Sequence, residues 1–147
     1  MTQDPIAFEF FNEIGIIDQL ISTMLTNRLP KGMSIAQFTV LNHFVRLKLD
    51  EKSPADLASA FQVSRPTMTS TLARMERAGL IAVRADPHDG RAKRVSLTDA
   101  GRAMRERCIA AVTELAPIIG GIASDDDLKA MLPALRQIRQ GLDRLRD

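Results

Sequence analysis

Apolar residues recur every three or four positions near both ends of the chain, which is the spacing of amphipathic helices. Near the N-terminus they predict one long helix over about residues 5–28, with a stripe formed by Phe10, Ile14, Ile17, Ile21 and Met24. Near the C-terminus they follow the three-and-four alternation of a coiled-coil seam, formed by Leu128, Met131, Leu135, Ile138, Leu142 and Leu145. Both stripes are longer than a small helical core can cover, so they predict burial against a partner subunit.

Residues typical of helix starts divide the middle of the chain into four further helices, and another such start precedes the C-terminal stripe. The predicted N-caps are Ser34, Ser53, Ser64, Thr98 and Ser124. Gln37 lies three residues after Ser34, which is the spacing of a capping box. Gly79 is the expected stop of the helix that begins after Ser64. Pro117 is expected to kink or end the helix that begins after Thr98.

Two short apolar alternations, at residues 81–83 and 95–97, predict a β-hairpin between the fourth and fifth helices. The intervening segment, Asp86-Pro87-His88-Asp89-Gly90-Arg91, is rich in turn residues, and its proline indicates a loop longer than two residues. Two short helices joined by a tight turn and followed by a hairpin describe a winged helix-turn-helix. The predicted fold class is therefore mainly α with a small β-hairpin, a winged helix-turn-helix with N- and C-terminal dimerisation helices.

Length supports this organisation. The 147 residues suffice for one domain with a dimerisation extension. We expect an N-terminal dimerisation helix in residues 1–32, a winged helix-turn-helix DNA-binding domain in residues 33–99, and C-terminal dimerisation helices in residues 100–147.

Charge is distributed unevenly along the chain. The net charge of +2 is too small to indicate a nucleic-acid partner by itself. Between Ser64 and Arg94, however, seven arginines and lysines face three acids, which leaves +4 there and −2 in the rest of the chain. Local basicity in a neutral or acidic body is typical of a phosphate-binding surface.

Composition also indicates in which cellular compartment the protein is expected. Cys108 is the single cysteine, so an intrachain disulfide is excluded and a reducing environment is favoured. No apolar run approaches the roughly 20 residues of a membrane span, and the first residues carry no basic targeting region. We therefore expect a soluble cytoplasmic protein without a membrane partner.

The fourth predicted helix is the candidate reader of the major groove. Its apolar positions, Met68, Leu72 and Met75, fall on one face and are expected to be buried. The opposite face carries mostly short side chains, among them Pro66, Ser70 and Ala73, and helix N-termini attract phosphate. On this evidence alone, an ordinary and weakly basic surface helix is an equally good interpretation.

The predicted hairpin shifts the balance toward DNA binding. Arg91 lies at its glycine-bearing tip, and Asp86 and Asp89 are expected to orient the guanidinium. An arginine held on a projecting loop suits a narrow minor groove, where the negative potential is enhanced. The neighbouring basic residues expected to meet flanking phosphates are His88, Lys93 and Arg94.

The stretch from Ser53 to Gly101 resembles the MarR (multiple antibiotic resistance regulator) family. The matching residues are Leu57-Ala58, Val63-Ser64, Thr67, Leu72, Glu76, Gly79-Leu80, Asp86-x-x-Asp89-x-Arg91 and Leu97-Thr98-x-x-Gly101. The resemblance implies an intertwined dimer that places its two fourth helices in successive major grooves. It also implies control by a small ligand, often a phenolic or aromatic acid, or by oxidation.

Carried onto this sequence, the resemblance implies DNA contacts by Ser64, Arg65, Thr67, Thr69, Arg74 and Arg91, which join the residues expected from the helix face and the hairpin. The predicted DNA-binding residues are Ser64, Arg65, Pro66, Thr67, Thr69, Ser70, Arg74, His88, Arg91, Lys93 and Arg94. Ser70 and Ala73 depart from the longer polar or basic residues that are common at these positions, so we expect few base contacts and more shape readout. The implied ligand pocket is assigned to Phe38, Asn42 and Arg46.

Other classes of function fit less well. The chain carries no phosphate loop, nucleophile elbow or HExxH motif, so we expect no enzyme, no catalytic residue and no cofactor. His43 and His88 are far apart, and Asp125-Asp126-Asp127 favours a helix start over a metal site. Cys108 lies in an apolar stripe and is interpreted as a buried, inert thiol. The predicted function is a sequence-specific regulator of transcription, a repressor that binds a pseudo-palindromic operator as a homodimer. The alternative is a winged-helix adaptor for protein interactions.

Overall fold

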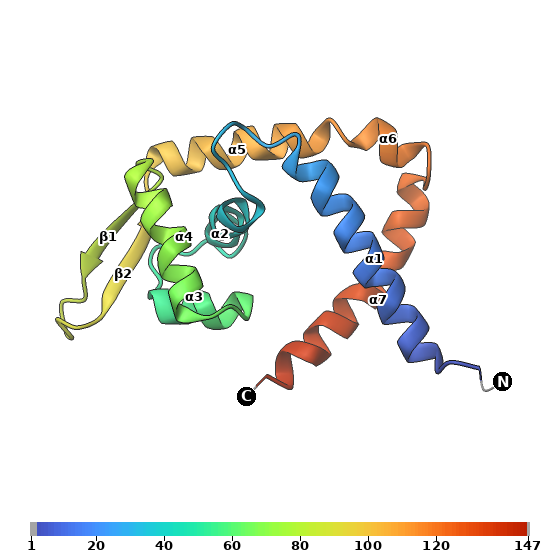
Figure 1. Cartoon of the computed structure of the whole chain (residues 1–147), viewed down its shortest axis with the longest axis horizontal. Helices are drawn as coiled ribbons and strands as arrows, with labels where there is room; N and C mark the ends of the chain where they lie inside the picture. Colours follow the sequence, from blue (N-terminus) through green and yellow to red (C-terminus); the bar gives the residue numbers. More distant parts are fainter. Residues whose placement is uncertain (1–2, 147) are drawn as a thin grey trace. The chain divides into compact units, whose positions relative to one another are not determined.

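The computed structural model describes residues 3–146 and shows a mainly helical chain with one two-stranded antiparallel sheet, as predicted (Figure 1). The elements are α1 (Ile6–Thr26), α2 (Ile35–Arg46), α3 (Pro54–Phe61), α4 (Arg65–Arg77), β1 (Ile81–Ala85), β2 (Lys93–Leu97), α5 (Asp99–Thr113), α6 (Ala116–Gly120) and α7 (Asp125–Arg144). Packing divides the chain into two compact units, residues 1–112 and 113–147. The boundaries predicted at residues 32 and 99 concern dimerisation and remain a prediction.

Every predicted N-cap is formed, so the helix starts follow from local sequence. In the capping box, Ser34 Oγ accepts from the backbone N–H of Gln37, and Gln37 Oε1 accepts from the N–H of Ser34, both at 3.1 Å. The other cap oxygens accept from the residue three positions on, at 3.0–3.2 Å: Ser53, Ser64, Thr98 and Ser124. Gly79 ends α4 with a φ of +74°, as its position predicted.

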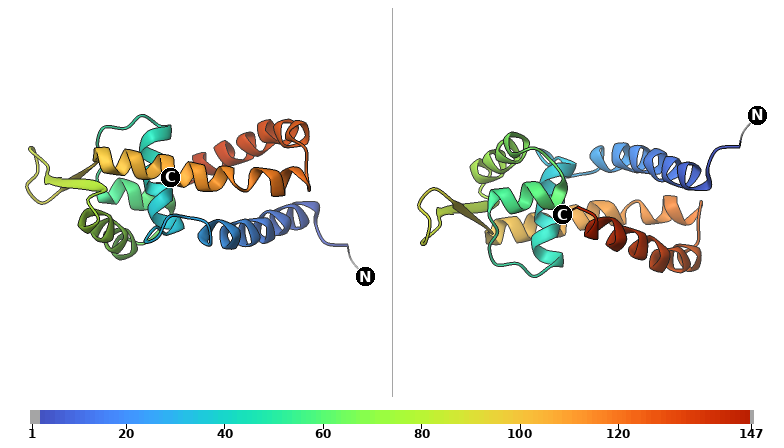
Figure 2. Two further views of the ribbon diagram at one scale, coloured as in Figure 1. Left: turned by 90° about the horizontal axis from the view of Figure 1, so that it is seen from above. Right: turned by 90° about the horizontal axis from the view of Figure 1, so that it is seen from below.

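One core joins the three helices of the helix-turn-helix region to the sheet. Its fully buried members come from α2, α3, α4 and β2: Val40, Leu41, Phe44, Leu57, Met75 and Val95. Lys52, in the loop before α3, extends the sheet by exchanging backbone hydrogen bonds of 3.0 and 2.8 Å with Val95. The hairpin projects from this body in both views of Figure 2.

The turn between α3 and α4 depends on one unusual residue. Gln62, the C-cap of α3, adopts the left-handed conformation with φ +53° and ψ +42°. Its side-chain amide donates to the carbonyl of Ser59 at 2.8 Å. This residue turns the chain from α3 into the α4 start within the three residues between the two helices.

A tight joint connects α4, the hairpin and α5. The carbonyl of Leu80 accepts from the N–H of Thr98 at 3.1 Å, and Thr98 Oγ1 donates to the carbonyl of Gly79 at 2.6 Å. Gly101, in the first turn of α5, lies directly against the Leu80 carbonyl, so that a Cβ there would overlap with the oxygen. The two ends of the hairpin and the start of α5 are thus held at Leu80.

The terminal helices have apolar faces that are not covered within the chain. Neither α1 nor α7 contains a buried residue. On α1 the exposed large side chains include Phe8, Ile17 and Leu20, of which Ile17 is 58% exposed. On α7 they include Met131 and Leu142.

Two prolines act differently in the C-terminal helices. The helix that begins after Thr98 ends at Thr113, before Pro117, which lies in the first turn of α6. A proline restricts the preceding residue and fits the first turn of a helix, so the break falls upstream of it. Pro133 lies inside α7 and does not interrupt it.

Cys108 is fully buried in α5, as predicted, and burial raises the pKa of its thiol. Within residues 3–146 no single helix is long and apolar enough to cross a membrane. One bent pair, Asp99–Gly120 with Asp125–Arg144, meets the test of length and composition only when the two are taken together.

The joint at Leu80 generates a stability prediction. Gly101→Ala should lower the free energy of unfolding by about 2–3 kcal/mol, because the added Cβ must displace backbone rather than a flexible side chain. Chemical denaturation measures the effect. Gly90→Ala is the control, since a Cβ at Gly90 meets nothing within 4 Å. Equal stabilities for the two variants would contradict the assigned role of Gly101.

Candidate nucleic-acid interface

Helix α4 presents the two faces that the sequence predicted. Met68, Leu72 and Met75 are buried against the core. The predicted contact residues on this helix and its cap are all exposed: Ser64, Arg65, Pro66, Thr67, Thr69, Ser70 and Arg74. Ala73 is exposed on the same surface, so the outer face carries mostly short side chains.

The N-terminus of α4 offers fewer free donors than we expected. Ser64 Oγ accepts from the N–H of Thr67 at 3.2 Å, and the two hydroxyls are joined by a hydrogen bond of 2.8 Å. Pro66 has no N–H. Within the described part of the chain, only Arg65 among these first-turn residues keeps an unpaired N–H, so phosphate binding here depends more on its guanidinium.

The carboxylates of the wing loop, residues 86–92, bind the backbone rather than the Arg91 guanidinium. Asp86 Oδ1 accepts from the N–H groups of His88 and Asp89 at 2.8 and 3.2 Å. Asp89 Oδ1 accepts from the N–H of Arg91 at 3.1 Å. Within residues 3–146 both acids fix the path of the loop that carries Arg91, and orientation of its guanidinium by Asp86 and Asp89 remains a prediction.

Asp86 uses its second oxygen to bind Arg94. Asp86 Oδ2 lies 2.8 Å from Arg94 Nε, and the Arg94 side chain is 38% exposed. The two residues meet because Asp86 pairs with Ala92 across the hairpin, and residues two apart on a strand share a face. The N–H of His88 and then the guanidinium of Arg94 hold the pKa of Asp86 below its usual value.

A second ion pair at the wing escaped the sequence analysis. Arg84 and Arg94 are direct partners in the strand register, which places two like charges side by side. Glu51 forms a bidentate ion pair with Arg84, with Nε–Oε1 and Nη2–Oε2 distances of 2.7 and 2.8 Å. These hydrogen bonds lower the pKa of Glu51. The period-two pattern places Arg84 on this face, but its partner lies 33 residues away in sequence.

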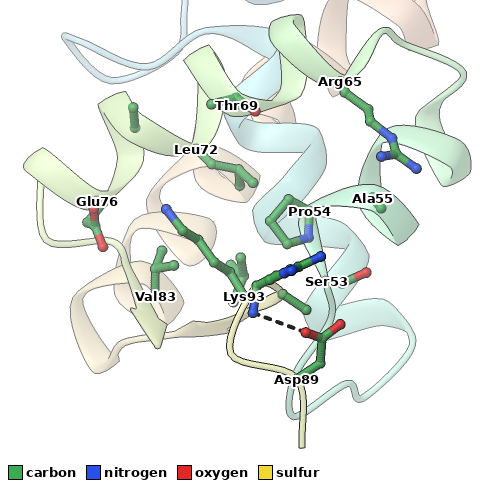
Figure 3. A pocket seen from close by; sticks show the side chains of 14 residues that line it. Ser53, Pro54, Ala55, Arg65, Thr69, Leu72, Glu76, Val83, Asp89 and Lys93 are labelled. Atoms are coloured by element: carbon green, nitrogen blue, oxygen red, sulfur yellow. Dashed lines mark hydrogen bonds between the residues drawn. The ribbon is translucent and has the colours of Figure 1, made fainter. Parts of the chain in front are cut away.

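A cavity of about 520 Å³ lies between the outer face of α4 and the wing (Figure 3). Arg65, Thr69 and Ala73 line it from the helix, and Arg91 and Lys93 line it from the wing. The N-terminal end of α3 closes it with Ser53, Pro54 and Ala55, as Figure 3 shows. Four predicted DNA-binding residues therefore surround one hollow.

The remaining predicted residues lie outside this cavity. His88 is exposed in the wing loop, and Arg94 is partly covered by its pair with Asp86.

Among residues 3–146, no group of three or more His, Cys, Asp or Glu side chains is placed to hold a metal ion.

The residues assigned to a ligand pocket do not line the cavity between α4 and the wing. Phe38 is half-buried and Arg46 is exposed. Asn42 Oδ1 accepts from Arg105 Nη2 of α5 at 3.0 Å. Asn42 thus has a structural partner that the sequence did not reveal.

Comparison with known proteins gives a consistent picture. Residues 31–92 match the model of the MarR family. The transcriptional activatory protein BadR of Rhodopseudomonas palustris is 29% identical over 117 residues, which cover 79% of this chain but only 66% of that protein, just under two thirds. These matches are to regulators of transcription and not to enzymes.

Solved structures share the fold over nearly the whole chain. A MarR mutant from E. coli in complex with operator DNA has a TM-score of 0.72 at 23% identity, covering 92% of this chain and 99% of that one. Bordetella bronchiseptica BpsR, whose DNA binding is regulated by 6-hydroxynicotinic acid, has a TM-score of 0.74 at 23% identity, covering 89% and 98%. A probable transcriptional regulator from Pseudomonas aeruginosa is 26% identical with a TM-score of 0.70, covering 92% and 97%.

The geometry at Asp86 generates a prediction about wing order. Asp86→Asn keeps an oxygen for the two N–H groups but loses the charge that binds Arg94. We expect the amides of His88 and Asp89 to exchange with solvent severalfold faster, which hydrogen-exchange NMR measures. Asp126→Asn, in the first turn of α7, is the control and should leave these amides unchanged.

The same contact predicts a pH dependence. A pKa lowered on folding means that the carboxylate stabilises the loop above its unfolded pKa of about 3.9 and loses this effect as the pH falls through the folded value. The wing loop should therefore stay ordered at pH 5 and lose order only in stronger acid. Loss of order already near neutral pH would contradict the assignment to Asp86.

Proposed function

We propose that this chain, whose residues 31–92 match the model of the MarR family, is a regulator of transcription that binds duplex DNA of preferred sequence as a homodimer. The observation that carries the proposal is the surface on which the exposed face of α4 meets Arg91 and Lys93 of the wing. A helix and a projecting loop side by side can engage adjacent major and minor grooves.

The outer face of α4 suits close approach to base edges. Thr69, Ser70 and Ala73 are short and exposed, so the helix backbone can lie deep in the major groove. Arg65 and Arg74 flank these residues and are placed to meet phosphates. With few long side chains on this face, sequence-dependent DNA shape contributes much of the specificity.

The basic residues of the wing have two different roles, ordering of the hairpin and contact with DNA. Arg84 and Arg94 are engaged by Glu51 and Asp86, so they order the hairpin. Arg91 and Lys93 form no ion pair within residues 3–146 and remain exposed for DNA. Because the backbone N–H of Arg91 is held by Asp89, the arginine enters the minor groove from an ordered loop.

The uncovered apolar faces of the terminal helices support a dimer. A stripe of phenylalanine, isoleucine and leucine on α1 and a seam of leucine and methionine on α7 would bury their surface against a second copy. In a two-fold dimer, half-sites about 34–36 Å apart give a pseudo-palindromic operator.

A small aromatic acid is the effector that we propose. BpsR responds to 6-hydroxynicotinic acid and shares this fold, which makes the same chemistry reasonable here. Repression remains the predicted direction of control, although the relative BadR is named as an activatory protein.

Replacing the wing arginine tests the DNA-binding proposal. Arg91→Ala should weaken operator binding by about 1–3 kcal/mol, since it removes a groove contact, without changing the circular dichroism spectrum. Fluorescence anisotropy on the chain's own upstream DNA and a scrambled duplex, over a salt series, measures it. Arg107→Ala, an exposed arginine of α5, is the control.

The adaptor alternative makes the opposite prediction. If the wing surface binds a protein instead, Arg91→Glu leaves DNA affinity as weak and as non-specific as in the parent chain. Sequence-independent binding by the folded parent protein would therefore overturn the proposed function.

The dimer is tested on the apolar face of α1. Ile17→Glu places a charge at a position that is exposed in the single chain, so it should leave the winged domain folded and prevent association. Sedimentation is expected to show twice the mass of one chain for the parent and a single-chain mass for the variant. Operator affinity should fall at least about tenfold, because one half-site contact is lost. Gln19→Glu supplies the same charge change on a polar position as the control.

A further inference from the structure

The hairpin has two faces, and only one of them lines the cavity beside α4. Val83, Lys93 and Val95 line that cavity. Arg84 and Arg94, which are direct partners in the register between β1 and β2, are not among its lining residues. Because successive side chains of a strand point to opposite faces, the two arginines lie on the back of the hairpin, opposite to the cavity. Any effect that they have on the proposed DNA-binding surface must therefore pass through the hairpin itself.

Glu51 reaches the back of the hairpin from another part of the chain. It lies in the loop before α3, and its two carboxylate oxygens bind Nε and Nη2 of Arg84 at 2.7 and 2.8 Å. A bidentate pair of an arginine and a carboxylate fixes the angle between the two groups as well as the distance. The pair thus connects β1 to the segment that leads into the helix-turn-helix.

The same segment is attached to the second strand and to the cavity wall. Lys52 exchanges backbone hydrogen bonds of 3.0 and 2.8 Å with Val95 of β2. Helix α3 begins at Pro54, and Ser53 and Pro54 line the cavity beside α4. Residues 51–54 therefore join both strands of the hairpin to the body that carries α4.

From this arrangement we propose that Glu51 is a positioning residue for DNA recognition. Its pair with Arg84 holds the wing at the angle that brings Arg91 to the minor groove while α4 lies in the major groove. The effect on DNA rests on the proposed function, whereas the effect on the angle of the wing does not. Glu51 itself acts from the back of the hairpin and needs no contact with DNA.

The tip of the wing amplifies small rotations at its base. Arg91 lies three residues beyond Arg94, which is about 10 Å at the rise of a β-strand. Over this distance a rotation of about 10° moves the backbone of Arg91 by about 2 Å. A hydrogen bond is made only at donor–acceptor distances of about 2.7–3.2 Å. A contact between Arg91 and DNA is therefore sensitive to the pair at the base.

A network gives the pair more weight than an isolated one has. Single ion pairs at a protein surface contribute little unless the geometry is bidentate or several charges act together. Both conditions hold here, because Asp86 binds Arg94 at 2.8 Å and Arg94 lies opposite Arg84. Two acids thus flank two arginines that would otherwise repel each other. Loss of Glu51 leaves both arginines with one acid between them.

Glu51→Gln tests the effect on DNA by a change whose sign simple electrostatics does not give. The amide keeps the size of the side chain, but it lacks the charge and can accept only one of the two hydrogen bonds. Removal of an acid by itself strengthens binding to any duplex. We expect instead that the affinity for the chain's own upstream DNA falls about three- to tenfold. Affinity for a scrambled duplex should stay equal or rise, as fluorescence anisotropy measures.

Asp50→Asn is the matched control. Asp50 precedes Glu51 in the same loop, is exposed, and forms no ion pair or side-chain hydrogen bond within residues 3–146. Its replacement changes the charge by the same amount and should leave the preference between the two duplexes unchanged. Equal behaviour of the two variants would overturn the proposal. So would a loss of affinity in Glu51→Gln that is the same on both duplexes, because a positioning role affects the preferred sequence.

A double-mutant cycle shows whether Glu51 acts through Arg91. In the Arg91→Ala background, Glu51→Gln should change affinity for the upstream DNA by less than about twofold, since the contact that Glu51 positions is already lost. Additive losses would contradict this mechanism. Arg84→Gln breaks the same pair from the hairpin side and should show the same non-additivity, which keeps the test decisive if Glu51→Gln folds poorly.

Residual dipolar couplings of the backbone amides test the angle of the wing without DNA. In Glu51→Gln the couplings of residues 86–92 should shrink relative to those of α2–α4, because a wider range of wing angles is averaged. Asp50→Asn should keep the parent values. Unchanged couplings in Glu51→Gln would rule out the positioning role. If the parent binds no duplex, or binds both equally, the proposed function fails, while these couplings still decide whether Glu51 holds the wing.

Discussion

The contact between Gly101 and the carbonyl of Leu80 is the constraint on which the winged domain depends. At this point α4 has ended, the hairpin begins and returns, and α5 starts. Hydrogen bonds from Thr98 to Leu80 and Gly79 close the same joint. The direction of the wing relative to α4 is therefore set by backbone packing rather than by long side chains. Helix α4 and the hairpin, which both line the proposed DNA-binding surface, meet at this joint.

Some arginines of the wing are paired with acids, and others are not. Two arginines face each other across the hairpin, an arrangement that is unfavourable unless each finds an acid. Glu51, in the loop before α3, binds Arg84, and Asp86, directly after β1, binds Arg94. The basic excess between Ser64 and Arg94 therefore overstates the charge that is available to DNA. The cations at the wing and on α4 that form no ion pair within residues 3–146 define the proposed DNA-binding surface.

The sequence predicted the features that depend on near neighbours. Helix caps, the stop at Gly79 and the buried face of α4 are determined within a few residues, and the structure confirms them. The side-chain partners that lie far apart in the sequence could not be predicted from it. Arg84 with Glu51, and Arg105 with Asn42, join residues 33 and 63 positions apart, and no periodicity encodes such pairs. Asp86 binds Arg94, because strand register decides which side chains share a face.

The left-handed Gln62 has a consequence for the thermodynamics of recognition. A non-glycine residue in this conformation carries a conformational cost of about 1 kcal/mol, which the surrounding fold must offset. A glycine would relieve that cost but would also let the elbow between α3 and α4 sample many angles in the unbound protein. With Gln62 the turn is already stiff in the free protein, so in the proposed complex the entropy of aligning α4 would be lost during folding and not during DNA binding. The helix-turn-helix is thus preorganised by one residue outside the proposed set of DNA contacts.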